Sequence, residues 1–509
     1  MKDTPDDSSA GNISRRKFIQ RATAAGLTLA VVGSATENKV DAQITKPTPA
    51  ATPSSPLRGL PAFDGSLTYE HTSLELAATD QGGIVHRLPC AVLKPRSVED
   101  VARIVRYAHA KRLPVAMRGR GHSAYGQTLV EGGIVVDSST LNRVVSVSAK
   151  AIEVEAGASL GTVVRAAFDA GSLVPVMGGC SMLSVGGFMS VGGVSARSFQ
   201  HGAFVDQVIE LQVVTGDGRV ITCSDRHEPE LFAMVLAGMG QCGIIVRTKL
   251  GLSPAPEQVT SRTITYESLE PFLADQERFA ANDHLDSLWT AIVRSDDGRW
   301  RFRATVGRRG GADEDVDPLP LLGDVSRGRV ATSVRRLYRD MVPPPSAASV
   351  SWRQEDAPTG ASIRHKVLGQ PALCVYLPAS AAREIMAPLL SSPNDSAGIS
   401  VIECVALNAN RFHRPLFRLP AEERIFTCWV LRTAYAESGP SLQRQVEVNA
   451  KFLERALALG AVRYPPFGGM TTPADWRVHY GESLYRRFAA AKQRYDKRGI
   501  LTRGAGIFP

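Results

Sequence analysis

Two stretches of the chain repeat apolar residues every three or four positions, which is the spacing of one helix face. The first covers residues 98–108, where Ser97 and Asp100 have the three-residue spacing typical of a helix N-terminus. The second covers residues 159–170 and stops at Gly171, and a glycine commonly follows the end of a helix. Both stretches therefore predict amphipathic helices.

Shorter apolar runs predict the strands. They lie at 114–117, 133–137 and 151–155. A longer apolar run at 208–222 is interrupted by Gly-Asp-Gly at 216–218, which predicts a β-hairpin. Because the helices and strands follow no regular β-α-β order, the pattern predicts an α+β fold.

Glycine and proline content indicates how the chain is divided. Glycines are dense up to residue 253 and sparser beyond it, so we expect one domain over 62–253 and a second over 254–463. Residues 464–509 form the remaining C-terminal segment. Residues 43–61 are rich in proline, serine and alanine, a composition typical of a linker.

Composition excludes several classes of protein. The chain has 509 residues, 44% hydrophobic and 21% charged, which is typical of a globular protein with more than one core. Its net charge of +9 is scattered along the chain, so we expect no nucleic-acid partner. No run of about 20 apolar residues follows residue 40, so we expect no membrane span in the mature chain. The seven cysteines lack the spacing of a metal site, so no metal is expected.

The first 42 residues carry an export pattern. The consecutive Arg15 and Arg16 precede a modestly apolar stretch at 22–35, and the Val-Asp-Ala sequence at 40–42 offers a cleavage site. The pattern resembles a twin-arginine signal peptide, the type that exports proteins already folded. We therefore expect a periplasmic or secreted protein that acquires its cofactor before export.

Two glycine-rich stretches carry the candidate chemistry, RGRGHSAYGQ at 118–127 and a second stretch at 177–202. Glycines let a ligand touch backbone amides, which suits a diphosphate. The Rossmann pattern GxGxxG fails because the third glycine is Gly126 and no helix is expected after it. We therefore expect a loop-built cradle for a dinucleotide.

The sequence RGRGHSAYGQ, followed by GGIVVDSSTLN, resembles the flavin-binding loop of FAD-linked oxidases of the vanillyl-alcohol-oxidase or PCMH type. The resemblance implies FAD as the cofactor and a two-domain PCMH-type α+β fold, with an α/β substrate domain that caps the flavin. In many members the histidine at the position of His122 is joined covalently to the flavin. The resemblance implies the same bond here.

Within that group the chain resembles cytokinin dehydrogenases most, over about residues 85–509. Besides the loop, SVGGFMSVGGVSARSFQHG, LQVVTGDGRVITCS and the C-terminal GILTRGAGIFP carry the likeness. It implies that residues 464–509 return to the flavin domain. The flavin contacts that it implies are Gly119, Gly121, His122, Ser123, Gln127, Ser184, Ser190, Val194, Ile245, Tyr464 and Thr502.

Three positions depart from the cytokinin dehydrogenase pattern. Gly179 stands where the family has the aspartate that accepts the substrate proton, Trp289 where it has an entrance glutamate, and Ala505 where it has a glutamine. We therefore expect slow or absent turnover of isoprenoid adenines and a preference for another amine or alcohol. The candidates for the catalytic base are Tyr464, Glu403 and His413.

Cys180 is a candidate for a second covalent bond. In the berberine-bridge-enzyme and oligosaccharide-oxidase branch of the superfamily, a cysteine at a fixed spacing before the second glycine of VGG bonds the flavin. Cys180 has that seven-residue spacing from Gly187. Two roles stay open for Cys180, a flavin bond or a small buried thiol.

Together these features predict an exported, cytokinin-dehydrogenase-like FAD oxidoreductase that oxidises a C–N or C–OH bond of a small molecule by hydride transfer to covalent flavin. The expected electron acceptor is oxygen or a quinone. Three alternatives stay open: a flavin-binding protein that has lost catalysis, an oligosaccharide or alcohol oxidase with bicovalent FAD, and a reductase that takes electrons from a nicotinamide.

Overall fold

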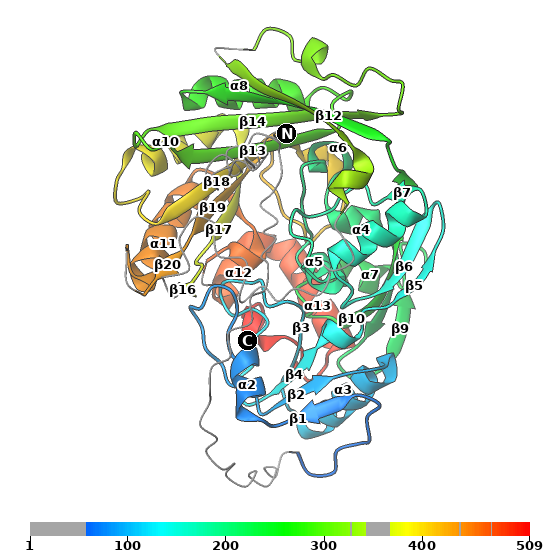
Figure 1. Ribbon diagram of the computed structural model, residues 1–509. Coiled ribbons are helices and arrows are strands. Elements are labelled where there is room, and N and C mark those ends of the chain that lie inside the picture. The colour runs from blue at the N-terminus through cyan, green and yellow to red at the C-terminus, as the bar shows by residue number, and fades with distance from the viewer. Residues whose placement is uncertain (1–56, 326–327, 343–366, 437–438, 470) are drawn as a thin grey trace, which may run out of the picture.

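The computed structural model describes residues 57–325, 328–342, 367–436, 439–469 and 471–509. The predicted signal peptide at 1–42 and residues 43–56 of the predicted linker lie outside the described residues. Helices and sheets are mixed in the described part of the chain, which confirms the predicted fold class (Figure 1). None of the described helices has both the length and the apolar character needed to cross a membrane.

A four-stranded sheet consists, in this order, of β1 (Ser66–Thr68), β2 (Ala91–Lys94), β4 (Ile134–Asp137) and β3 (Val115–Arg118). Strand β4 pairs in parallel with both β2 and β3. Helix α3 (Val98–Lys111) connects β2 to β3, as a parallel pair requires, and α2 (His71–Ala77) precedes β2. This part of the molecule is therefore a local β-α-β unit that the α+β prediction did not include.

Serine hydroxyls cap both helices predicted from sequence, and the predicted cap at Ser97 is confirmed. The Ser97 hydroxyl accepts a hydrogen bond from the Asp100 N–H at 3.2 Å and begins α3. The Ser159 hydroxyl likewise accepts from the Thr162 N–H at 3.0 Å and begins α4 (Leu160–Asp169). Each cap gives a partner to a backbone donor that the first helical turn leaves unpaired.

A five-stranded antiparallel sheet follows, in the order β5 (Val144–Val147), β6 (Ala151–Glu155), β10 (Ile244–Gly251), β8 (Val208–Val214) and β9 (Val220–Cys223). Strands β8 and β9 form the predicted hairpin. The short pair β7 (Ser172–Leu173) and β11 (Ser253–Pro254) lies beside it. The helices of this region are α4, α5 (Val185–Ser190), α6 (Ser198–His201) and α7 (Pro229–Val235).

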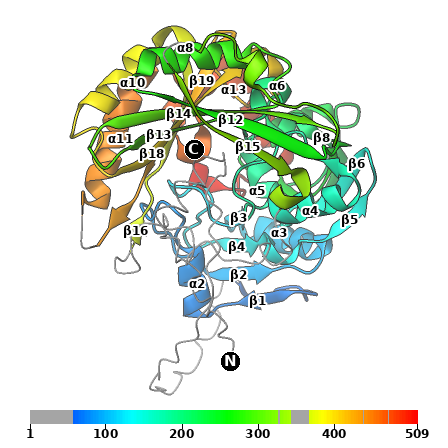
Figure 2. The same ribbon diagram turned by 45° about the horizontal axis from the view of Figure 1, so that its top comes forward.

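An eight-stranded antiparallel sheet occupies the upper part of Figure 1, in the order β15 (Arg329–Leu337), β12 (Gln258–Tyr266), β14 (Trp300–Gly310), β13 (Ser287–Arg294), β18 (Ile399–Asn408), β19 (Arg424–Arg432), β17 (Leu373–Pro378) and β21 (Val462–Arg463). The outer face is covered by α8 (Leu269–Ala280), α10 (Ala382–Ser391) and α11 (Leu442–Ala458), as Figures 1 and 2 show. A short pair, β16 (Val367–Gly369) and β20 (Ala434–Tyr435), lies at its margin. The other face looks toward the glycine loops.

The C-terminal segment packs against the four-stranded sheet. After α12 (Pro473–Tyr480) and α13 (Glu482–Tyr495), the backbone of Ile500 and Thr502 exchanges hydrogen bonds with Val115 of β3, both at 2.8 Å. Leu501 thereby forms a parallel bridge with Val115. The last residues of the chain thus reach the base of the first glycine loop, while the domain boundaries at 253 and 463 stay predictions.

Candidate active site

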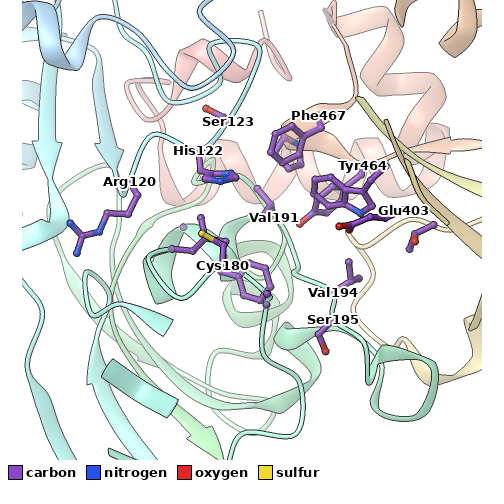
Figure 3. A pocket seen from close by; sticks show the side chains of 18 of the residues that line it. Arg120, His122, Ser123, Cys180, Val191, Val194, Ser195, Glu403, Tyr464 and Phe467 are labelled. Carbon is purple, nitrogen blue, oxygen red and sulfur yellow. The ribbon is translucent and has the colours of Figure 1, made fainter. Parts of the chain in front are cut away.

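Two adjoining cavities lie between the glycine loops and the eight-stranded sheet. The larger has a volume of about 320 Å³ and the smaller one of about 90 Å³. Both are lined by Gly119, Ser123, Thr128, Gly187, Val191 and Pro466. Figure 3 looks into the larger cavity, with His122 and Cys180 on one side and Tyr464 and Glu403 on the other.

The glycine loops form one wall, which we call the flavin wall and define as residues 118–127 and 178–195. Close approach of the two loops requires glycine at Gly119, because a Cβ there would overlap the Ser184 hydroxyl. Gly121 has a φ of +68°, in the left-handed region that side chains disfavour. The loops therefore meet closely, and they bring both backbone and side chains such as those of His122, Cys180 and Phe188 to the cavity.

Asp80 holds the first loop in place. Its carboxylate accepts hydrogen bonds from the Gly126 N–H at 2.7 Å and from the Ser123 hydroxyl at 3.0 Å. Burial raises the pKa of Asp80 to about 6. The sequence prediction missed this residue because it lies about 40 positions before the loop, in a segment without a motif.

His122 presents a neutral imidazole to the cavity. Its ring meets that of Phe467 edge-on, with centroids 6.1 Å apart, and no side chain among the described residues hydrogen-bonds to the imidazole. Removal from water lowers the pKa of His122 to about 4. Near pH 7 the ring is therefore uncharged and keeps a nitrogen lone pair available for bonding.

The eight-stranded sheet forms the opposite wall, which we call the cap wall. Alternation along strands turns every second residue toward the cavity. The residues so placed are Trp289 on β13, Glu403, Val405 and Leu407 on β18, and Thr427, Trp429 and Leu431 on β19. The residues between them face the helices; for example, the Cys404 sulfur lies 3.4 Å from that of Met386 on α10.

Glu403 is the one acidic residue among the described residues lining the larger cavity. It lies directly across from Trp429 in the β18–β19 register. Burial alone raises the pKa of Glu403 to about 8. A carboxyl group with a pKa so close to neutrality is suited to accept a proton from a bound molecule.

Tyr464 is placed for packing and hydrogen bonding. Its hydroxyl accepts a hydrogen bond from the Gly193 N–H, and burial raises the pKa of the phenol. Its ring lies 5.5 Å from that of Trp429 and 5.8 Å from that of Tyr376. A phenol held protonated in this way favours Glu403 over Tyr464 as the base.

His413, the third candidate base, is exposed and lines neither cavity. Its backbone N–H donates to the Asp206 carboxylate at 3.2 Å. The structure thus places it away from the other two candidates.

The smaller cavity brings together the remaining predicted cofactor residues, Gln127, Ser190, Ile245 and Thr502. The Thr502 hydroxyl donates to the Gly240 carbonyl at 3.2 Å, and a Cβ at Gly240 would lie 2.7 Å from that hydroxyl. Between the two cavities the buried Thr128 hydroxyl has no partner among the described residues.

Except for His413, all the site residues predicted from sequence therefore line one of the two cavities. Gly119, Gly121, His122, Ser123, Cys180, Ser184, Val194, Glu403 and Tyr464 line the larger one. A glycine cradle that a Cβ would fill, an unpartnered hydroxyl and a neutral histidine fit a bound flavin dinucleotide. The prediction missed Phe188, Trp429 and Phe467, which nothing in the local sequence distinguishes from core residues.

Comparisons with known proteins agree with this arrangement. A family model described as an FAD binding domain matches residues 89–224, and one described as "Cytokinin dehydrogenase 1, FAD and cytokinin binding" matches residues 370–508. The matched segments contain the flavin wall and, with the exception of Trp289, the cap-wall residues named above.

Relatives extend the likeness over most of the chain. An uncharacterized oxidoreductase of the fasciation locus of Rhodococcoides fascians is 31% identical, over 85% of this chain and 96% of its own. Cytokinin dehydrogenase 10 of Oryza sativa subsp. japonica is 30% identical, over 86% of this chain and 88% of its own.

Among solved structures, 6-hydroxy-D-nicotine oxidase from Arthrobacter nicotinovorans has a similar fold. Its TM-score is 0.67 at 21% identity, over 86% of this chain and 96% of that one. The two-domain flavoprotein fold expected from sequence is thus confirmed. The fold, the glycine cradle and the relatives together show that this chain belongs to the FAD-dependent oxidoreductases of the cytokinin dehydrogenase family.

Proposed function

We propose that this FAD-dependent oxidoreductase oxidises a C–N or C–OH bond of a small molecule, with its flavin bound covalently through His122. The observation that carries the proposal is the pairing of two unlike walls around one cavity. The flavin wall offers backbone and a neutral imidazole, and the cap wall offers aromatic rings and one carboxyl group.

When bound, FAD supplies the two-electron acceptor for a hydride. The chain's own residues do the rest. The loop glycines let the cofactor approach the backbone, Asp80 fixes the first loop, and the aromatic cap-wall residues exclude water from the reacting carbon. Glu403 and Tyr464 lie together on the side of the cavity opposite His122 in Figure 3.

Attachment at His122 requires a neutral imidazole nitrogen. A bond forms between this nitrogen and a flavin methyl carbon, one N–H and one C–H bond break, and two protons leave. Bound FAD would take up the two electrons released, and an external acceptor, oxygen or a quinone, would then receive them. The lowered pKa of His122 supports this role, since a protonated ring has no lone pair to give.

The function is tested by adding candidate amines, alcohols and sugars to the purified yellow protein without oxygen. Loss of the oxidised flavin absorbance with at least one compound is the expected result. A protein that binds flavin but bleaches with none of them would instead support the alternative that catalysis has been lost. Oxidation of NADPH by the protein would favour the reductase alternative.

A second covalent bond through Cys180 is favoured by its place beside His122 on the flavin wall (Figure 3). His122→Ala and Cys180→Ser, alone and together, test this. If both bonds form, either single variant keeps flavin through denaturation and only the double variant releases it. Release from His122→Ala alone would show a single bond.

Because the chain belongs to the cytokinin dehydrogenase family, cytokinins are candidate substrates. The relatives named above include a cytokinin dehydrogenase, but Gly179 cannot accept a proton, so we propose slow or absent turnover of isoprenoid adenines. Isopentenyladenine oxidation with an artificial acceptor measures this, with Gly179→Asp as the companion variant. Efficient turnover by the parent would contradict the proposal.

We also propose export through the twin-arginine pattern at Arg15 and Arg16. Replacing both with lysine keeps the charge but removes the pattern. The variant should remain in the cytoplasm as a folded flavoprotein. Equal appearance of parent and variant outside the cytoplasm would refute this proposal.

A further inference from the structure

Glu403, which is half-buried and lines the cavity, differs from the fully buried acids of the described chain. Its carboxyl group has neither a hydrogen-bond donor nor a cation as partner, and burial is the one cause that shifts its pKa. A buried carboxyl group without a partner is destabilising unless it stays protonated or meets a ligand.

Three fully buried acids of the described chain have hydrogen-bond or ion-pair partners. Asp275 accepts from the Tyr266 hydroxyl at 2.8 Å and from Arg278 at 2.6 Å. Asp496 pairs with Lys492 at 2.7 Å, and Glu155 with Arg143 at 2.7 Å. Each of these acids has structural partners, whereas the surroundings of Glu403 leave its carboxyl group for a molecule in the cavity.

We propose that Glu403 is the proton acceptor of the oxidation, so that the cap sheet carries the base instead of the loop at Gly179. This inference rests on the proposed function. Glu403 is the sole acid among the described cavity residues, and it lies across the cavity from His122. A substrate between the walls can therefore face the flavin side with its carbon and the cap side with its N–H or O–H.

The step balances with groups already named. A hydride leaves the substrate carbon toward the flavin side, and the N–H or O–H proton passes to a Glu403 carboxylate oxygen. The C–N or C–O single bond becomes a double bond. Glu403 later releases the proton to water, and the electron pair leaves on oxygen or a quinone.

The remaining polar groups of the cavity limit the substrate. The Thr427 hydroxyl already accepts from the Val405 N–H at 3.3 Å, and that of Ser195 accepts from the Arg197 N–H at 3.2 Å. Most cap-wall side chains that line the cavity are apolar, namely those of Trp289, Val405, Leu407, Trp429 and Leu431. The cavity therefore suits a largely apolar molecule with one N–H or O–H next to the oxidised carbon, because a sugar would bury hydroxyls without partners.

Burial moves the pKa of three other ionisable groups around the cavity away from neutrality. The ionisable residues that line it are Arg120, His122, Cys180 and Tyr464, and Cys374 of β17 lies close enough to interact with Glu403. Burial raises the pKa of Tyr464 and Cys374 and lowers that of His122 to about 4.

An infrared titration of the yellow protein tests the state of Glu403 without any substrate. The parent should show the carbonyl stretch of a protonated carboxylic acid at pH 6.5, fading as the pH passes about 8. Glu403→Gln should lose the component that fades near pH 8 and keep only the component of Asp80, which fades near pH 6. The matched control Glu384→Gln, at an exposed position of α10 on the outer side of the same sheet, should keep both components. A band unchanged in Glu403→Gln would overturn the assignment.

Anaerobic flavin reduction then tests the role, with isopentenyladenine, N-methylbenzylamine, benzyl alcohol and glucose as probes. In the parent the rate of flavin reduction by an apolar probe should rise with pH to a plateau above about 8. Glucose should not reduce the flavin. In Glu403→Gln the rate of flavin reduction should fall about 10²–10⁴-fold and should no longer depend on pH. In Glu384→Gln the rate should match that of the parent.

The experiment can contradict the proposed function and the role of Glu403 separately. If no probe bleaches the parent flavin, the proposed function fails and the role of Glu403 fails with it. If the parent bleaches and Glu403→Gln bleaches equally fast, the proposed function stands and Glu403 is not the base. Bleaching by glucose alone would contradict the substrate class.

Discussion

The flavin wall and the cap wall enclose the same cavity but are built in different ways. The flavin wall comes from two continuous loops, 118–127 and 178–195, in which glycine brings backbone to the surface. The cap wall comes from alternate residues of β13, β18 and β19, and side chains make its surface. A wall of backbone suits a cofactor of fixed shape, whereas a wall of side chains can be adapted to a substrate without altering the cofactor site.

The largest effect should come from removing residues 500–509, which complete the flavin wall. Val115 would lose both backbone hydrogen bonds to this segment, and the smaller cavity would lose Thr502. We expect the truncated protein to retain no FAD after gel filtration. Thr502→Val, which removes the hydroxyl bond to the Gly240 carbonyl but keeps the shape of the side chain, should have the same direction if the truncation does not fold. Normal FAD content in both variants would contradict the topology.

A smaller loss of flavin is expected for Asp80→Asn. The amide replaces a carboxylate that accepts from Ser123 and Gly126, at a cost of about 1–3 kcal/mol for hydrogen bonds to a charged group. The flavin-to-protein absorbance ratio should fall several-fold relative to Asp296→Asn, an exposed control. Equal ratios would show that the loop does not depend on Asp80.

Trp429→Ala should show that the cap wall affects substrate binding without affecting flavin binding. The indole packs 4.9 Å from the Phe467 ring and 5.5 Å from that of Tyr464, centroid to centroid, on the substrate side of the cavity. Its loss should raise KM about tenfold or more, the size expected for lost apolar contact, with flavin content unchanged. A fall in flavin content at constant KM would mean that the two walls do not divide their tasks as we describe.

The smallest expected effect is on the pH dependence of the melting temperature in Glu403→Gln. Burial raises the pKa of Glu403 from 4.5 to about 8, so between these values the folded protein holds a proton that the unfolded chain has released. This favours unfolding increasingly as the pH rises through that window. Glu403→Gln removes the effect, so its melting temperature should exceed that of the parent by a few degrees at pH 8 and match it near pH 4. The reverse trend would contradict an isolated carboxyl group.

The same contrast explains what the sequence could predict. His122 and the Ser97 cap depend on neighbours within a few residues, so local motifs revealed them. Asp80 and Trp429 act through contacts with residues far away in the chain, and only the register of β18 and β19 shows that Glu403 lies opposite Trp429.

The most direct test of the central claim, that the flavin wall holds its cofactor through His122, is mass spectrometry of the yellow protein after trypsin. Cleavage after Arg120 and Arg143 yields a peptide of residues 121–143 that contains His122 as its sole histidine. We predict that this peptide carries the mass of FAD, alone or cross-linked to the peptide that contains Cys180. An unmodified 121–143 peptide from protein that retains its yellow colour would contradict the claim.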